Sequence, residues 1–322
     1  MSKRKITKQQ AARIKQKQQL HCETATSTQN ESASDGLIIT RFGRRAEIED
    51  LSGVRIHCAI RPHLQSLVAG DRVVWQAEGP NLGVVISQYP RESVLARPDA
   101  HGRLKPIAAN ITQVCVVVAP KPTLSWVLLD SYLVMAESLN LRACIVMNKI
   151  DLASQALRQK LETIYQPLYP IVFTGLDHAE GDAALADALN NQTSIFVGQS
   201  GVGKSSIIGR LLPHEEGIQT GALSTSTNLG CHTTSSTSLY HIPTGGALID
   251  SPGVREFGLG HLSTAHIAKS YREFKPLIDQ CKFRNCNHQD TPGCAILDAV
   301  NKGQISAHRY ENYVRISAQF TK

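Results

Sequence analysis

The chain has 322 residues and a mass of 35.1 kDa, a length that favours two or three domains over one. Hydrophobic residues make up 42% of it, which excludes a wholly disordered protein. No apolar run approaches the roughly 18 residues that a membrane span needs, and the first 20 residues lack the apolar stretch of a secretory signal. We therefore expect a cytoplasmic protein that is not inserted in a membrane.

The net charge of +7 lies in an N-terminal tail. Residues 1–20 carry seven basic residues and no acidic one, whereas the rest of the chain carries both signs equally. Residues 1–35 also lack hydrophobic periodicity, which predicts a basic, flexible tail. Such an arm favours a polyanionic partner, a nucleic acid first and a membrane surface second. A disordered leader that only improves solubility is the alternative.

Short alternating strands separated by turn signals are typical of residues 36–96. This pattern predicts a small β-barrel, an OB-fold first and an SH3-like barrel as the alternative. Aromatic residues make up only 5% of the chain, so RNA binding by such a barrel would depend on phosphate contacts and shape rather than base stacking. The five predicted strands are 37–41, 45–50, 54–60, 71–75 and 83–89.

Strands and helices alternate over residues 97–260, which predicts a mostly parallel α/β sheet. Residues 213–240 are rich in Gly, Ser and Thr, and we expect a long irregular loop there with a functional role. The predicted strands are 113–119, 144–147, 171–173, 194–197 and 247–249, and the predicted helices are 124–140, 154–165 and 204–212.

A complete phosphate-binding loop motif, G-x-x-x-x-G-K-S, follows the strand at 194–197 and precedes a predicted helix. The backbone N–H groups of such a loop surround the phosphates of a nucleotide. Lys204 is expected to reach the β- and γ-phosphates, and Ser205 to bind Mg²⁺. The predicted nucleotide-binding residues are Gly198, Gln199, Ser200, Gly201, Val202, Gly203, Lys204, Ser205 and Ser206.

The segment Asn148-Lys149-Ile150-Asp151 predicts that the base is guanine. It stands directly after the strand at 144–147, in a chain that also carries a phosphate loop. The Asp151 carboxylate can accept hydrogen bonds from guanine N1–H and N2–H₂ together, a pair of donors that adenine lacks. Asn148 can meet the guanine edge, and the aliphatic part of Lys149 can cover the base. The sequence therefore predicts a site for GTP and GDP.

Two further segments complete the predicted GTPase. Asp250, at the end of the strand at 247–249, is expected to hold Mg²⁺ through water, and the Gly253 amide to contact the γ-phosphate. In the loop at 213–240, one of Thr233 and Thr234 is expected to sense Mg²⁺ and the γ-phosphate, with Thr234 favoured.

The order of these segments is unusual, because the guanine segment at 148 precedes the phosphate loop at 198. A standard GTPase has the reverse order, so we predict a circularly permuted GTPase domain. Val254 stands where many GTPases have a Gln that orients the attacking water. Intrinsic hydrolysis should therefore be slow, and His232 in the nearby loop is the candidate for a substitute catalytic group.

Residues 261–322 have short helical patterns and are predicted to form a small separate domain. Three cysteines and one histidine crowd together in it. Four N/S ligands fill the tetrahedral coordination of Zn²⁺ and leave no open position, so the predicted role of the ion is structural. The expected zinc ligands are Cys281, Cys286, His288 and Cys294.

From about residue 36 to the end, the chain resembles the ribosome small subunit-dependent GTPase A family. The resemblance is carried by an OB-like barrel, NKID before GQSGVGKSS, the loop GCHTT, DSPGVREFGL and the C-x₄-C-x-H-x₅-C cluster. It implies a cytoplasmic, monomeric GTPase that assists late maturation of the 30S ribosomal subunit and contacts 16S rRNA. It also implies hydrolysis that is slow alone and stimulated by the 30S subunit, with Mg²⁺ bound beside GTP and one structural Zn²⁺.

The chain departs from that family pattern at two places. Cys231 stands where the family has a basic or amide residue, and Thr174-Gly175 replace a Ser-Ala-like guanine loop. Two other functions remain open at this point. One is a GTPase of the same build that acts on another RNA or on the large subunit, and the other is an RNA-binding scaffold that holds GTP as a structural ligand.

Overall fold

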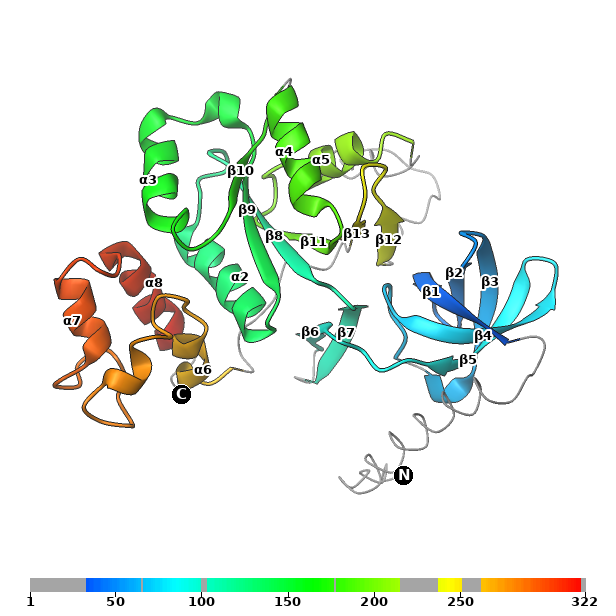
Figure 1. Cartoon of the computed structure of the whole chain (residues 1–322), viewed down its shortest axis with the longest axis horizontal. Helices are drawn as coiled ribbons and strands as arrows, with labels where there is room; N and C mark the ends of the chain where they lie inside the picture. Colours follow the sequence, from blue (N-terminus) through cyan, green and yellow to red (C-terminus); the bar gives the residue numbers. More distant parts are fainter. Residues whose placement is uncertain are drawn as a thin grey trace, which may run out of the picture. The chain divides into compact units, whose positions relative to one another are not determined.

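The computed structural model describes residues 33–64, 66–99, 103–176, 178–214, 237–250 and 262–319. These residues form two compact units, each of which is described by itself (Figure 1). The first unit contains the described residues up to Asn110, together with 237–240 and 249–250, and the second contains the others. Residues 1–32 of the predicted basic tail lie outside the described residues.

The first unit is built around a closed five-stranded barrel. Strands β1 and β4 pair and close the order β1-β2-β3-β5-β4, in which only β3 and β5 run parallel. This Greek-key arrangement is the predicted OB-like barrel and not the SH3-like alternative. The strands are β1 (Ala33–Phe42), β2 (Arg45–Asp50), β3 (Arg55–Ile60), β4 (Arg72–Gly79) and β5 (Leu82–Gln88), and a 3-10 helix (Pro62–Leu64) follows β3. A further strand, β12 (Ser238–His241), pairs with β1 at Thr40, so the predicted irregular loop ends in a strand.

Alternation along the strands explains why this sequence closes into a barrel. In β3, Ile56 and Cys58 are buried while Arg55, His57 and Ala59 are exposed, so every second side chain enters the core. The barrel core consists of Ile38, Ala46, Ile48, Ile56, Cys58, Leu64, Leu67, Val73, Trp75 and Val85.

A two-stranded hairpin follows the barrel, formed by β6 (Val94–Pro98) and β7 (Leu104–Ala109). The sequence does not predict this hairpin, because Pro98 stands at the end of one strand and Pro106 within the other. Proline lacks the N–H that an inner strand must donate, but an isolated hairpin consists only of edge strands and tolerates it.

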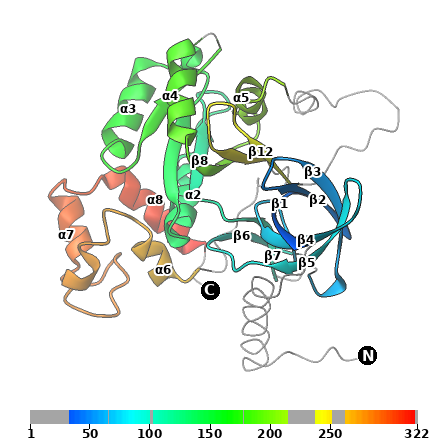
Figure 2. The same ribbon diagram turned by 45° about the vertical axis from the view of Figure 1, so that its right-hand side comes forward.

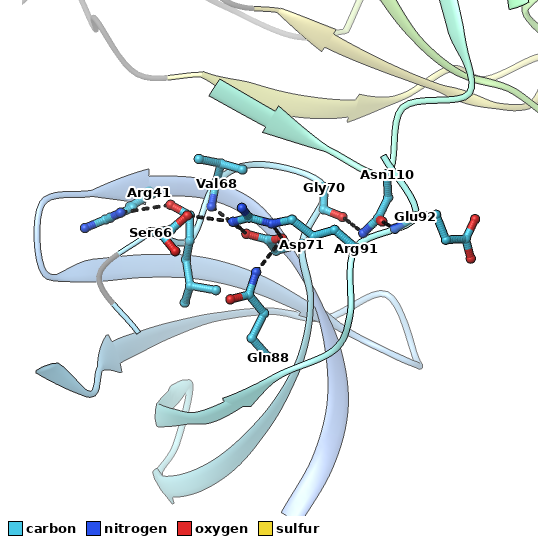
Figure 3. Close-up of polar contacts among 10 residues, drawn as sticks. Arg41, Ser66, Val68, Gly70, Asp71, Gln88, Arg91, Glu92 and Asn110 are labelled. Atoms are coloured by element: carbon cyan, nitrogen blue, oxygen red, sulfur yellow. Dashed lines mark hydrogen bonds and ion pairs between the residues drawn. The ribbon is translucent and has the colours of Figure 1, made fainter. Parts of the chain in front are cut away.

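A buried carboxylate fixes the chain where it leaves the barrel (Figure 3). Asp71 is fully buried and accepts hydrogen bonds from Arg91 Nε at 2.6 Å, Gln88 Nε2 at 2.9 Å and the Val68 N–H at 2.7 Å. Arg91 Nη2 also donates to the Ser66 carbonyl at 2.6 Å, so one ion pair joins the loop before β4 to the segment that follows β5.

The second unit contains the predicted parallel sheet. Its strands β8 (Gln113–Val118), β9 (Arg142–Met147), β10 (Ile171–Phe173) and β11 (Thr193–Val197) are parallel in the order β10-β9-β8-β11. The next strand, β13 (Ala247–Asp250), begins in this unit beside β11. Every residue of β8 is buried, as expected for an inner strand of a parallel sheet with helices on its faces.

The helices of this unit connect the strands. They are α2 (Trp126–Ser138), α3 (Gln155–Tyr165), α4 (Ala179–Leu189) and α5 (Lys204–Leu211). All but α4 were predicted. Ser125 and Ser154 cap α2 and α3 by accepting hydrogen bonds from the N–H groups of Leu128 and Leu157.

Three short helices make up the C-terminal part of the second unit: α6 (Thr264–Lys269), α7 (Ala295–Asn301) and α8 (Ala307–Ala318). Arg309 of α8 is fully buried and donates to Asp130 of α2 and to Glu273. Asp130 also accepts hydrogen bonds from Asn312 and Tyr165, both at 2.8 Å. Because buried charges require such partners, this cluster fixes α8 to α2 and to the end of α3.

Among the helices that the structure describes, none combines the length and the apolar character needed to cross a bilayer.

Candidate nucleotide and metal sites

The phosphate loop lies in the second unit between β11 and α5, as the motif predicts. Gly198 has φ +144° and Gly203 has φ +95°, which side-chain-bearing residues rarely adopt. A Cβ at Gly198 would lie 2.2 Å from the Val117 carbonyl oxygen, and one at Gly203 would lie 2.3 Å from Asn148 Nδ2. Both positions therefore require glycine for conformation and for space.

Lys204 begins α5 and folds back over the loop. Its ammonium group donates to the carbonyl oxygens of Gly198 at 2.8 Å and Gln199 at 2.9 Å. Ser205 and Ser206 are exposed in the first turn of the same helix, where unpaired backbone N–H groups favour an anion. These residues provide positive charge and hydrogen-bond donors where a phosphate chain would bind.

The predicted guanine segment is hydrogen-bonded directly to the phosphate loop. Asn148 is buried, and its Nδ2 donates to the Val202 carbonyl at 2.9 Å. The Lys149 ammonium donates to the carbonyl of Gly201 at 2.6 Å and to that of Lys121 at 2.9 Å. Two side chains of NKID therefore connect two loops that are some 50 residues apart in sequence.

The Asp151 carboxylate is exposed, in contrast to Asn148. Gly175 lies against it, since a Cβ at Gly175 would be 3.1 Å from Asp151 Oδ1. The Ile150 N–H donates to the Thr174 carbonyl at 3.2 Å, which joins the NKID segment to the end of β10. Because Gly175 has no side chain, the accessible Asp151 carboxylate can accept hydrogen bonds from guanine N1–H and N2–H₂.

Sequence reasoning missed several contributors to this arrangement. Lys121 provides a carbonyl for Lys149, and the Tyr132 hydroxyl on α2 is hydrogen-bonded by the Gly198 N–H. Neither residue belongs to a motif, so no local signal identified them. Thr174 and Gly175 did carry a signal, because they differ from the expected guanine loop.

The remaining predicted GTPase residues are described only in part. Asp250 is the last residue of β13, as expected, and is half-buried in the first unit. The other four, His232, Thr233, Thr234 and Gly253, lie outside the described residues.

The structure brings the four predicted metal ligands together. One ligand atom from each of Cys281, Cys286, His288 and Cys294 lies within 4.8 Å of the others. His288 Nδ1 is 3.6 Å from the sulfur of Cys281 and also from that of Cys294. A tetrahedral Zn²⁺, with Zn–S bonds of about 2.3 Å and Zn–N bonds of about 2.0 Å, separates its ligand atoms by roughly 3.5–3.8 Å. The cluster fits such an ion.

Burial affects the protonation of two of the four predicted ligands in opposite ways. Burial raises the pKa of the Cys294 thiol to about 11 and lowers the pKa of His288. The imidazole is therefore neutral and ready to bind, whereas the buried thiol keeps its proton until a cation displaces it.

Helix α8 supports the cluster from behind. The hydroxyl groups of Tyr310 and Tyr313 donate to the carbonyls of His288 at 2.9 Å and Asn287 at 3.1 Å. His288 itself has φ +60°, a left-handed conformation that a side-chain-bearing residue adopts at a steric cost. Such outer contacts hold a ligand in the orientation that a metal needs.

Comparisons with known proteins agree with this arrangement. A profile of the family described as RsgA GTPase matches residues 88–260. A Vibrio cholerae protein named small ribosomal subunit biogenesis GTPase RsgA is 45% identical over 99% of this chain and 84% of its own length. The chain belongs to the RsgA GTPase family. As an RsgA-family protein it is a GTP-hydrolysing enzyme, which the phosphate loop and NKID also indicate.

Another named relative and two solved structures also match most of the chain. The protein of the same name from Proteus mirabilis is 44% identical over 98% of this chain and 95% of its own length. The crystal structure of YjeQ from Thermotoga maritima superimposes with a TM-score of 0.74 and 32% identity, covering 89% of this chain and 98% of that one. The structure of YloQ, described as a circularly permuted GTPase, has the same fold, with a TM-score of 0.73 and 24% identity over 91% and 96% of the two chains.

Proposed function

We propose that this chain is a GTPase that assists late maturation of the small ribosomal subunit, hydrolyses GTP slowly alone and is stimulated by the 30S subunit. The observation that carries the proposal is the direct bonding of NKID to the phosphate loop, through Asn148 and Lys149, in a chain of this family. The names of its relatives supply the ribosomal part of the proposal.

Most of the predicted site residues have a proposed role. Asp151 recognises guanine, Lys204 binds the β- and γ-phosphates, and the loop amides of residues 198–203 surround the phosphate chain. Mg²⁺, when bound, neutralises developing phosphate charge, and Ser205, Thr234 and Asp250 are the residues proposed to hold it. Thr233 and Gly253 are proposed to contact the nucleotide.

Zn²⁺ is proposed as the ion of the Cys281, Cys286, His288 and Cys294 cluster, with a structural role. Four protein ligands saturate a tetrahedral ion, so no position remains for a water or a substrate.

Contact with 16S rRNA is proposed to involve the basic tail and one end of the barrel. Arg44 and Arg45 at the β1–β2 turn are exposed, and so is Arg61 after β3. Arg45 pairs across the sheet with Ala59, which places Arg61 at the same end of the barrel. Guanidinium groups at one end of an OB-like barrel suit a phosphate backbone. We also propose that the protein acts as a monomer in the cytoplasm.

The decisive experiment measures single-turnover GTP hydrolysis by the full chain alone, with 30S subunits and with 50S subunits. We expect a strong increase with 30S only. Equal stimulation by 50S would favour a GTPase that acts on another RNA, and no hydrolysis under any condition would favour a scaffold that holds GTP as a ligand.

His232 is proposed to orient the attacking water once the 30S subunit is bound, because Val254 lacks a hydrogen-bonding group. His232→Ala should keep GTP affinity and 30S binding but lose most of the 30S-stimulated hydrolysis. Hydrolysis at saturating 30S, with nucleotide affinity measured in parallel, tests this. Full stimulation in the variant would assign the positioning of water to the ribosome.

A further inference from the structure

An ion pair outside every predicted motif, between Arg210 of α5 and Asp182 of α4, contacts Thr174 directly after β10. Arg210 Nε is 3.0 Å from Asp182 Oδ2, and its Nη2 is 3.0 Å from Asp182 Oδ1. The Thr174 hydroxyl donates to Asp182 Oδ1 at 2.8 Å and accepts from Arg210 Nη2 at 3.0 Å. The bidentate pair and the hydroxyl thus form a closed set of hydrogen bonds.

The two charged residues lie at helix ends that favour them. Asp182 is in the first turn of α4 and Arg210 in the last turn of α5, so each interacts favourably with the dipole of its own helix. Gly181 lets α4 approach β10 closely, since a Cβ there would lie 2.2 Å from the Phe173 carbonyl oxygen. The first turn of α4 therefore packs directly on the residue that ends β10.

Thr174 connects this ion pair to the NKID segment. Its side chain is fully buried, its N–H donates to the Met147 carbonyl at 2.8 Å, and its carbonyl accepts from Ile150 at 3.2 Å. The next residue is Gly175, which lies beside the Asp151 carboxylate. Loss of the hydrogen bonds of the Thr174 hydroxyl would therefore shift Gly175 relative to that carboxylate.

We propose that Arg210 and Asp182 are positioning residues for base recognition, which fix Thr174-Gly175 beside Asp151 and so set the preference for guanine over adenine. The inference rests on the proposed guanine site at NKID. The side chains of Arg210 and Asp182 are 27% and 37% exposed, so water screens part of the attraction between them. Arg210 also belongs to the helix that Lys204 begins, so the pair connects the base side of the site with its phosphate side.

The test compares the dissociation constants of the full chain for GDP and ADP. Phosphate contacts are common to the two nucleotides, so the ratio of ADP to GDP dissociation constants isolates recognition of the base. Arg210→Ala and Thr174→Val should each lower that ratio by about five- to tenfold, the scale of one hydrogen bond. Thr174→Ser keeps the hydroxyl and should retain the wild-type ratio.

Two controls separate this inference from the function on which it rests. Lys302→Ala removes an exposed ion pair with Asp298 on α7, 2.6 Å in length, and should leave the ratio unchanged. If Asp151→Asn leaves the guanine preference of the wild type intact, the guanine site itself is misassigned.

If Asp151→Asn lowers the ratio but Arg210→Ala and Thr174→Val keep it, the positioning role is overturned and the site stands. An equal loss of affinity for GDP and ADP would also overturn it, because that result indicates a merely structural role. Should Arg210→Ala fail to fold, the pair Thr174→Val and Thr174→Ser decides the question alone.

Discussion

The phosphate loop with NKID and the metal cluster belong to the same unit but are held together in different ways. The phosphate loop is fixed by backbone conformation and by side chains that bond to carbonyls, as Lys149 does at Gly201. The cluster consists of four side chains on irregular segments, and its thiols gain a strong partner only from a cation. The first site should therefore exist before its ligand binds, whereas the second depends on its ion.

The largest expected effect follows from this dependence. Metal analysis of the purified chain should find one Zn²⁺, and Cys286→Ala should lose the ion and the fold of the C-terminal helices. Binding of a structural zinc ion contributes about 10 kcal/mol or more of folding free energy in small sites. Cys58→Ala, which changes a buried barrel cysteine, is the control and should keep the ion.

Loss of the zinc ion should leave the nucleotide site intact. GDP affinity of Cys286→Ala should stay within a few-fold of the wild type, because no residue of the phosphate loop bonds to the cluster in the part of the chain that the structure describes. A complete loss of GDP binding would show that the nucleotide site is not preformed.

The next effect concerns the buried charges that attach the C-terminal helices to α2. Arg309→Leu leaves Asp130 and Glu273 without their cation and should lower the free energy of unfolding by about 3–5 kcal/mol. Urea unfolding measures it, with Lys302→Ala as the surface control. A loss below about 1 kcal/mol, the value of an exposed pair, would mean that this cluster does not hold the helices.

A smaller effect is expected at the phosphate loop. Lys204→Ala removes a cation that should bind the phosphates through charge-assisted hydrogen bonds of about 1.5–3 kcal/mol. GTP affinity should fall by about 10- to 100-fold while the thermal unfolding midpoint changes little. Titration with a fluorescent GTP analogue measures the affinity, and unchanged binding would place the phosphates elsewhere.

The two sites also differ in how far the sequence predicts them. The cluster and the phosphate loop have fixed spacings, so their residues could be named in advance. The contacts that Lys121 and Tyr132 make could not, because these residues reach the site through the packing of the segment after β8 and of α2. Every residue has a backbone carbonyl, so the residue type does not reveal which carbonyl accepts a hydrogen bond.

The fold shows the same limit. Alternating and fully apolar runs predicted the barrel and the parallel sheet, since burial requires those patterns. The hairpin of β6 and β7 was missed because Pro98 and Pro106 argue against strands. Helix α4 was missed because its sequence, AEGDAALADAL, is rich in alanine and carries a weak apolar periodicity.

The proposed activity depends most on recognition of the guanine base by Asp151. Xanthine carries a carbonyl where guanine carries its N2 amino group, and an asparagine amide can donate to that carbonyl. Competition between GTP and XTP for the wild-type chain and for Asp151→Asn is therefore the most direct test. We predict that the wild type prefers GTP and that the variant shifts toward XTP. An unchanged preference for GTP in the variant would contradict the assignment of NKID to the base.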